Sequence, residues 1–350
     1  MATDTLLYLS SDDVLLACEE IDPVAAVRDA LVLQADGRVR LPNEALLEWE
    51  PDGGGSARSI SMPAFLDDDL KVGGTKIINA STQNPARGLP RASGVVVLFD
   101  TVTARPLCLM EASHISGLRT ASVTILAAQH LLTRDAATAA FIGAGPLTRH
   151  HAILAALRLP QITLCRITDL VPERAQALCQ ALGDLVSPDR MKFEAVGTSR
   201  EAVSGADLVV PCTTTRQPYI RRDWLTAGCV AVNISLDDLC EDVLLGADRL
   251  YIDDWNLVMS DSHRLLGRLA RAGRVRQAGA DTGPPASHDS ASQVATGTIG
   301  ELILGRCAGR TAEDQLCVVN PFGMAIEDVS LAHRVYQVAN MRALGVNLLR

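Results

Sequence analysis

A short apolar segment that ends in a glycine turn constrains the fold of this chain most. Residues 139–142 are apolar, residues 143–145 read Gly-Ala-Gly, and a helical pattern follows up to Arg158. A strand, a glycine turn and a helix N-terminus in this order form an anion site, because the turn lets the backbone approach a pyrophosphate and the helix end offers N–H groups. Thr148 replaces the third glycine of the usual Gly-x-Gly-x-x-Gly pattern and Pro146 has no N–H, so an ordinary strand-to-helix turn is the alternative.

The pattern that follows this turn favours a cofactor site. Strand-like and helical segments alternate, which predicts a parallel, doubly wound sheet of the Rossmann type. Asp169 comes just after the second strand, where a carboxylate accepts ribose hydroxyls and repels a 2′-phosphate, so we expect NAD. Asp169 is alternatively a helix N-cap, and the nearby Arg166 and Arg174 leave NADP open. The expected strands are residues 139–142, 161–167, 192–196, 207–212, 229–234 and 249–252.

The residues before the turn predict a mixed α and β domain. Helical patterns run from a start signal at residues 10–13 to residue 18, then over residues 23–34 and, rich in alanine, over residues 116–132. Strand-like segments are residues 59–62, 70–78, 94–100 and 107–110, the last two spaced as a hairpin. Near the other end, residues 271–298 are rich in Gly, Ser, Ala and Pro and predict a loop or a mobile segment, and residues 325–344 predict an amphipathic helix.

Composition and residue spacing argue against several partners, locations and ligands. The 350 residues carry a formal net charge of −9, which argues against nucleic acid or an anionic membrane. The chain has no apolar run long enough for a bilayer and its first five residues lack the basic region of a signal peptide, so we expect a cytoplasmic protein. The nine cysteines include no Cys-x-x-Cys and the seven histidines form no ligand pattern, so we expect reduced thiols and no metal site.

Charged residues beside apolar segments are candidates for the chemistry. Lys76 interrupts an apolar strand, and Arg119 stands at a helix start where a guanidinium can hold a carboxylate. A third cation on a predicted strand is Arg58, and each of the three is alternatively a surface charge. Asp237 and Asp238 follow an apolar strand, the place where open α/β sheets hold an acid or base, although solvated loop acids are the alternative.

Five ordered segments resemble the ornithine cyclodeaminase/mu-crystallin family over nearly the whole chain. They are residues 74–76, 116–122, 142–145, 233–238 and 323–328. The resemblance implies a homodimer whose N-terminal α+β domain also uses the C-terminal helix, with a Rossmann domain inserted between. We therefore expect a substrate-binding and dimerisation domain over residues 1–124 and 315–350, and an NAD-binding Rossmann domain over residues 125–314.

Further segments are similar to one branch of that family, the N-(2-amino-2-carboxyethyl)-L-glutamate dehydrogenases. They are residues 58–63, 91–98, 110–113, 217–220, 253–255 and 320–324. This resemblance implies NAD-dependent oxidative hydrolysis of the conjugate to 2,3-diaminopropionate and 2-oxoglutarate with NADH release, in siderophore or peptide-antibiotic biosynthesis. Ile60 and Ser61 replace the glutamate that ornithine cyclodeaminases carry before Met-Pro, and residues 236–240 replace their Gly-Gly-Asp-Cys-Pro-Gly block. Both departures disfavour ornithine as the substrate.

The resemblance also implies roles for single residues. Lys76 and Arg119 match positions that hold the substrate α-carboxylate, and Asp238 matches the catalytic aspartate. We expect catalytic roles for Asp238 and Lys76, and substrate binding by four cations that would meet three carboxylates: Arg58, Lys76, Arg91 and Arg119. The expected cofactor-binding residues are Thr120, Gly143, Ala144, Gly145, Pro146, Leu147, Asp169, Thr213 and Ser235. The alternatives are ornithine cyclodeaminase-type deamination, ketimine or imino acid reduction, and nucleotide binding without catalysis.

Overall fold

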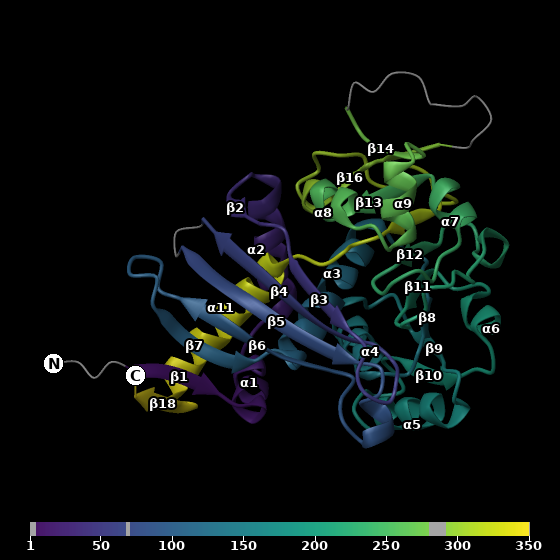
Figure 1. Cartoon of the computed structure of the whole chain (residues 1–350). Coiled ribbons are helices and arrows are strands. Elements are labelled where there is room, and N and C mark those ends of the chain that lie inside the picture. The colour runs from purple at the N-terminus through teal and green to yellow at the C-terminus, as the bar shows by residue number, and fades with distance from the viewer. Residues whose placement is uncertain (1–4, 68–70, 280–291, 350) are drawn as a thin grey trace. The chain divides into compact units, whose positions relative to one another are not determined.

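The computed structural model describes residues 5–67, 71–279 and 292–349 and divides the chain into two compact units (Figure 1). Unit 1 comprises Met1–Arg119 and Met324–Arg350, and unit 2 comprises Thr120–Gly323. The first boundary lies inside helix α3 (Ser113–Leu131). The second lies after strand β17 (Cys317–Val319), which pairs with strands of unit 2. Residues 315–323, which we expected in the first domain, therefore belong to unit 2.

Unit 1 is built on one mixed sheet in the order β18-β1-β7-β6-β5-β4-β2, with β3 also paired to β4. All its pairs are antiparallel except that of β1 with β7. The expected strands are present and longer than the patterns indicated, and Leu70 lies outside the described residues. The strands are β1 (Thr5–Leu9), β2 (Val39–Arg40), β3 (Ala45–Trp49), β4 (Ala57–Leu66), β5 (Val72–Ser81), β6 (Ala92–Phe99), β7 (Pro106–Glu111) and β18 (Val346–Leu349).

Helices α1 (Ser11–Cys18), α2 (Pro23–Ala35) and α11 (Ala325–Arg342) complete unit 1, with a short 3₁₀ turn, η1 (Pro85–Arg87). Local sequence fixes two of their starts: Ser10 and Asp13 form a capping box at α1, and Asp22 caps α2. Helix α11 packs on β4, β5 and α2 and lies across the sheet in Figure 1. Its N-terminal turn thereby comes to the same face of the sheet as Lys76 of β5.

Unit 2 contains an eight-stranded sheet in the order β10-β9-β8-β11-β12-β17-β13-β16, in which every pair is parallel. The predicted doubly wound Rossmann sheet is confirmed. From β8 the chain moves outward to β9 and β10 and then returns to β11 on the other side of β8. The strands are β8 (Thr138–Ile142), β9 (Leu164–Thr168), β10 (Lys192–Ala195), β11 (Leu208–Pro211), β12 (Val230–Val232), β13 (Arg249–Ile252), β16 (Gly297–Thr298) and β17.

Ligands of such sheets bind where the strand order reverses, at the carboxyl ends of the strands. Here the reversal lies between β8 and β11. The helices of unit 2 besides α3 are α4 (Pro146–Arg158), α5 (Pro172–Gly183), α6 (Ser199–Val203), α7 (Glu241–Leu245), α8 (Trp255–Ser260), α9 (Leu265–Arg271) and α10 (Ile299–Ile303), with a 3₁₀ turn η2 (Arg222–Trp224).

The segment expected to be a loop over residues 271–298 is only partly irregular. It contains β14 (Val275–Gln277) and β15 (Gln293–Ala295), which pair in parallel, and it ends in β16. The expectation was wrong for these strands because each is only two or three residues long, too short to show a period. Residues 280–291 lie outside the described residues.

Two further findings concern the helices and the cysteines of the described residues. Among the described residues, no helix combines the length and the apolar character needed to cross a membrane. All nine cysteines fall within the described residues and are free thiols, and burial raises the pKa of several of them, including that of Cys212 to about 12. Such thiols are poor nucleophiles at neutral pH.

Arg190 closes the C-terminal end of α4, the helix that follows the glycine turn. Its guanidinium donates hydrogen bonds to the carbonyl oxygens of Ala155, Ala156, Leu159 and Ile162 at 2.5–3.1 Å. Arg190→Met removes all of these donors, and we expect it to lower the free energy of unfolding by about 2–3 kcal/mol. Urea denaturation measures the loss, with the exposed Arg174 changed to Met as the matched control; equal stability of both variants would contradict the assignment.

Candidate functional site

The turn after β8 requires glycine at its first position. Gly143 has φ of 97°, and a Cβ there would lie 2.9 Å from the carbonyl oxygen of Cys212. Its N–H donates to the Thr168 carbonyl at 2.8 Å. The close approach of β8, β9 and the segment after β11 therefore excludes any side chain at this position.

Position 145 favours glycine for a different reason than position 143. Gly145 is the N-cap of α4, and a Cβ there would meet nothing within 4 Å. No side chain caps this helix, so its first N–H groups, including that of Leu147, keep their capacity for an anion. The protein's own packing thus leaves room at Gly145, as close approach of a phosphate requires. Thr148 at the third position is buried, and its hydroxyl donates to the Gly143 carbonyl, closing the turn without a glycine.

Asp169 is held over this turn at the end of β9. One carboxylate oxygen accepts from the Ala144 N–H at 2.8 Å and the other from the Val171 N–H at 2.9 Å. The N-cap of α5 is Val171, without a side-chain cap, so the alternative of a helix cap at Asp169 is wrong. The guanidinium of Arg166 donates to the Ser204 carbonyl at 2.7 Å. The carboxylate therefore stands at the edge where an adenosine ribose lies in folds of this kind.

Asp238 lies at the carboxyl edge of the same sheet, after β12. Its Oδ1 accepts from the hydroxyls of Thr213 at 2.5 Å and Tyr219 at 3.1 Å. Its backbone carbonyl accepts from the N–H groups of Tyr219 and Ile220, both at 3.0 Å. The side chain is fully buried, and among the described residues Oδ2 has no hydrogen-bond partner.

Burial raises the pKa of Asp238 from 3.8 to about 6, against the hydrogen bonds from Thr213 and Tyr219, which lower it. Asp237 adds to the rise through its charge. A carboxyl group with this pKa exchanges a proton near neutral pH, and Oδ2 is the oxygen available for the transfer. The geometry therefore suits an acid or base.

The neighbouring Asp237 is a structural residue. Its carboxylate accepts from the Leu265 N–H at 2.7 Å and pairs with Arg268 at 3.4 Å, which fixes the start of α9. Of the other residues expected near the cofactor, Ser235 donates its hydroxyl to the Pro211 carbonyl at 3.3 Å. Thr120 is half-buried in α3, at the first position of unit 2.

In unit 1, the two expected carboxylate-binding cations are already paired. Lys76 Nζ lies 2.6 Å from Asp328 Oδ2 and donates to the Ser116 hydroxyl at 3.3 Å. Arg119 donates from Nη1 to Glu327 at 2.8 Å, and its Nε lies 3.3 Å from Asp328 Oδ1. Burial lowers the pKa of Lys76, and the charge of Asp328 opposes that shift. We call these four ionisable side chains, Lys76, Arg119, Glu327 and Asp328, the ion quartet.

The other two expected cations lie apart from the ion quartet. Arg58 is on β4 between Glu48 and Ala80, half-buried, and shares the sheet face of Lys76. It stands four residues along the strand from Met62, the partner of Lys76, which is roughly 13 Å. Arg91 is exposed just before β6. The structure therefore brings Lys76 and Arg119 together, and among the described residues no hydrogen bond or ion pair joins either of them to Arg58 or Arg91.

Sequence reasoning missed four residues of these two groups. Tyr219 and Ser116 were inside segments that carried the family resemblance, but no pattern marked their hydroxyls. Glu327 and Asp328 lay in a segment that carried the family resemblance and in a predicted amphipathic helix, but neither was assigned a role. One signal could have identified the two acids. Glu327 and Asp328 are adjacent and both are buried by α11, and buried carboxylates require cationic or hydrogen-bonding partners.

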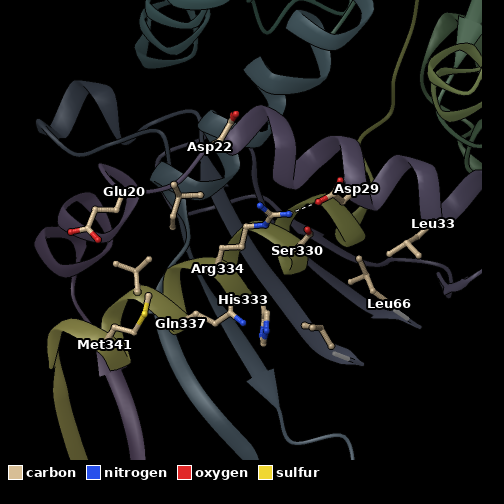
Figure 2. A pocket seen from close by; sticks show the side chains of 13 residues that line it. Glu20, Asp22, Asp29, Leu33, Leu66, Ser330, His333, Arg334, Gln337 and Met341 are labelled. Carbon is tan, nitrogen blue, oxygen red and sulfur yellow. Dashed lines mark hydrogen bonds and ion pairs between the residues drawn. The ribbon is translucent and has the colours of Figure 1, made fainter. Parts of the chain in front are cut away.

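A separate cavity of about 300 Å³ lies in unit 1, beside α2 and α11 (Figure 2). Its acidic residues are already satisfied. Glu20 pairs with Arg342 at 2.9 Å, Asp29 pairs with Arg334, and Asp22 accepts two backbone N–H groups at the start of α2. The cavity therefore offers no charge that requires a ligand, and it is not part of the candidate site.

The parallel sheet, the glycine turn and the acid at its carboxyl edge define a Rossmann-type nucleotide-binding fold. The chain belongs to the ornithine cyclodeaminase/mu-crystallin family, whose model matches residues 9–342. The family resemblance predicted from the sequence is thereby confirmed.

Individual relatives cover nearly the whole chain. It is 31% identical to the N-((2S)-2-amino-2-carboxyethyl)-L-glutamate dehydrogenase of Staphylococcus aureus (strain NCTC 8325 / PS 47), with 98% of each chain covered. It is 34% identical to CmnK, whose crystal structure matches with a TM-score of 0.86 over 99% of this chain and 98% of that one. An archaeal alanine dehydrogenase dimer with bound NAD is 23% identical, with a TM-score of 0.80 and 99% of each chain covered, and shows the shared fold.

The adjacent aspartates lead to opposite predictions for stability. The folded-state pKa of Asp238 is raised, so the proton stabilises the fold below about pH 4 and this contribution is lost as the pH rises through about 6. Asp238→Asn should therefore be more stable than the wild type at pH 8, by up to about 2–3 kcal/mol, and equal to it near pH 4.

Asp237→Asn is the matched comparison. It weakens charge-assisted bonds to Leu265 and Arg268 and should lower the free energy of unfolding by about 1 kcal/mol. Urea denaturation of both variants at pH 4 and pH 8 provides the measurement. Loss of stability in Asp238→Asn at pH 8 would show that its carboxylate is not under a burial penalty.

Proposed function

We propose that the protein is an NAD-dependent dehydrogenase acting on a CH–NH bond. Its substrate is N-(2-amino-2-carboxyethyl)-L-glutamate, which reacts with NAD⁺ and water to give 2,3-diaminopropionate, 2-oxoglutarate, NADH and a proton. The carrying observation is Asp238, a buried acid with an available oxygen at the carboxyl edge of the sheet that bears the glycine turn. The similarity to the staphylococcal dehydrogenase over 98% of each chain supports the choice of substrate.

NAD is the cofactor, and the residues of unit 2 fit it. The uncapped N-terminus of α4 and the space at Gly145 suit a pyrophosphate, and Asp169 suits a ribose diol rather than a 2′-phosphate. When bound, NAD supplies the acceptor for the hydride on the glutamate Cα. The residues that would hold it are Thr120, Gly143, Ala144, Gly145, Pro146, Leu147, Asp169, Thr213 and Ser235.

Asp238 provides the acid–base chemistry. Oxidation of the CH–NH bond leaves an imine, which water must attack and which must then lose its amine. The carboxylate form of Asp238 accepts the proton of that water at Oδ2, and the acid form returns it to the departing nitrogen. Thr213 and Tyr219 hold Oδ1 and so fix the direction of Oδ2. A pKa of about 6 allows both forms near neutral pH.

Unit 1 binds the substrate. Arg119 is the member of the ion quartet with an exposed part, 11% of its side chain, and it takes a carboxylate. Arg58 and Arg91 remain proposed partners of the other carboxylates. Lys76 is 1% exposed and bonded to Asp328 and Ser116. In place of the catalytic role expected from the sequence, we propose that it holds the ion quartet together and does not contact the substrate.

The functional molecule is a homodimer formed by unit 1. The face of the sheet opposite α11 carries half-buried apolar side chains in register, with Ile77 beside Val95 and Val97 beside Leu109. A second copy is the occupant, since the archaeal alanine dehydrogenase of the same fold is a dimer. We further propose that it works in the cytoplasm and supplies 2,3-diaminopropionate to siderophore or peptide-antibiotic assembly.

The direct test is NADH absorbance with the glutamate conjugate as substrate. The wild type should accumulate NADH and release 2-oxoglutarate in equal amounts, and Asp238→Asn should bind NAD yet lose at least about a hundredfold in kcat. Proline and ammonia from ornithine without net NADH would indicate a cyclodeaminase, and consumption of NADH on cyclic ketimines would indicate a reductase. NAD binding with no turnover of any of these would leave a binding protein.

The two glycines of the turn separate cofactor binding from folding. Gly143→Ala forces a Cβ against the Cys212 carbonyl at positive φ, so it should lower Tm by several degrees. Gly145→Ala meets no protein atom within 4 Å, so Tm should stay unchanged while the Kd for NADH, measured by its fluorescence, rises about tenfold or more. An unchanged Kd in Gly145→Ala would remove this turn from the cofactor site.

A further inference from the structure

With all four side chains ionised, the ion quartet of unit 1 carries no net charge. Lys76 and Arg119 are its cations, and Glu327 and Asp328 are its anions, each within 3.3 Å of a cation. Glu44 adds a further negative influence on Arg119. The sequence suggested a positively charged carboxylate clamp, but in the structure two buried acids offset the charges of its two cations Lys76 and Arg119.

A ligand meets the ion quartet through Arg119. The side chain of Arg119 is 11% exposed, whereas those of Lys76, Glu327 and Asp328 are 1%, 0% and 0% exposed. Nη1 and Nε of Arg119 face the two acids, and Nη2 has no hydrogen-bond partner among the described residues. A carboxylate that docks on Nη2 therefore experiences Glu327 close behind the guanidinium.

This arrangement disfavours a bare carboxylate. Its negative charge would give the ion quartet and ligand together a net charge of −1, in a place where burial weakens solvent screening. A carboxylate whose neighbouring carbon carries an ammonium adds no net charge, and the ammonium is attracted by the two acids. The favoured ligand is thus a zwitterionic amino-acid head group.

We propose that Glu327 is a specificity-determining residue that makes unit 1 prefer an α-amino acid to the corresponding α-keto acid. This inference rests on the proposed function, in which the glutamate Cα of the substrate carries a carboxylate and a protonated secondary amine. The product 2-oxoglutarate keeps the carboxylate but has a neutral ketone in place of the amine. Glu327 therefore favours substrate over this product and speeds product release.

L-Glutamate and 2-oxoglutarate are the probes, because they differ only in the ammonium and the ketone at Cα. Calorimetric titration of the full-length protein with each gives two dissociation constants and needs no turnover. The wild type should bind L-glutamate at least about tenfold more tightly, a difference of roughly 1.4 kcal/mol. Tighter or equal binding of 2-oxoglutarate by the wild type would overturn the proposal without any variant.

Glu327→Gln then tests the residue. The amide oxygen still accepts from Arg119, but the lost charge leaves the ion quartet net positive, so 2-oxoglutarate should bind more tightly and the preference should fall below about threefold. Glu327→Asp keeps the charge and should restore the wild-type preference. Glu50→Gln, at an exposed position of unit 1, is the control and should leave the preference unchanged.

The outcomes separate this proposal from the proposed function. A wild-type preference that persists within twofold in a folded Glu327→Gln would overturn the role of Glu327, whatever the enzyme oxidises. A purely structural role would weaken both ligands equally and leave their ratio unchanged, which also counts against the proposal. Failure to form NADH from the conjugate, with the predicted shift in the binding ratio, would overturn the substrate assignment alone.

Discussion

Unit 1 depends on the pairing of buried cations with buried acids. Lys76 of β5 and Arg119 of α3 meet Asp328 and Glu327 of α11, across 252 and 208 residues of sequence. Removing one partner of such a pair leaves an unpaired charge buried away from water, which lowers the free energy of unfolding by about 3–5 kcal/mol. The C-terminal helix must therefore lie on the N-terminal sheet, and the two ends of the chain form one unit around an inserted Rossmann fold.

Unit 2 depends instead on parallel strand order. Because β8, β11 and β12 are adjacent and parallel, the residues after each strand arrive at one edge of the sheet. The glycine turn follows β8, Thr213 follows β11 and Asp238 follows β12. The hydrogen bond between Thr213 and Asp238 is a direct consequence of that order. The glycine turn, Asp169 and Asp238 thus come to one edge of the sheet as a consequence of the order in which its parallel strands pair.

The sequence predicted the elements whose physics is local. The alternating strands and helices of unit 2 and the glycine turn were readable from period and composition, and the order of the parallel sheet confirmed them. Strand β17 and the short strands β14 to β16 could not be predicted, because segments of two or three residues show no hydrophobic period. The charge of the ion quartet was also unreadable, because Lys76 and Asp328 are partners only after folding. Lys76 and Arg119 were readable as candidates for a carboxylate site, but the two buried acids that offset their charges were not.

The two units use buried acids in opposite ways. In unit 1 the acids are paired with cations, so their charges are offset within the ion quartet. In unit 2, Asp238 is buried with hydroxyl partners and no cation among the described residues, so the cheapest way to relieve burial is to take up a proton. Asp237, one residue away, instead accepts from the Leu265 N–H and pairs with Arg268. The partners that the fold places beside each buried carboxylate, cations or hydroxyl groups, therefore decide whether its charge is offset by a cation or removed by a proton.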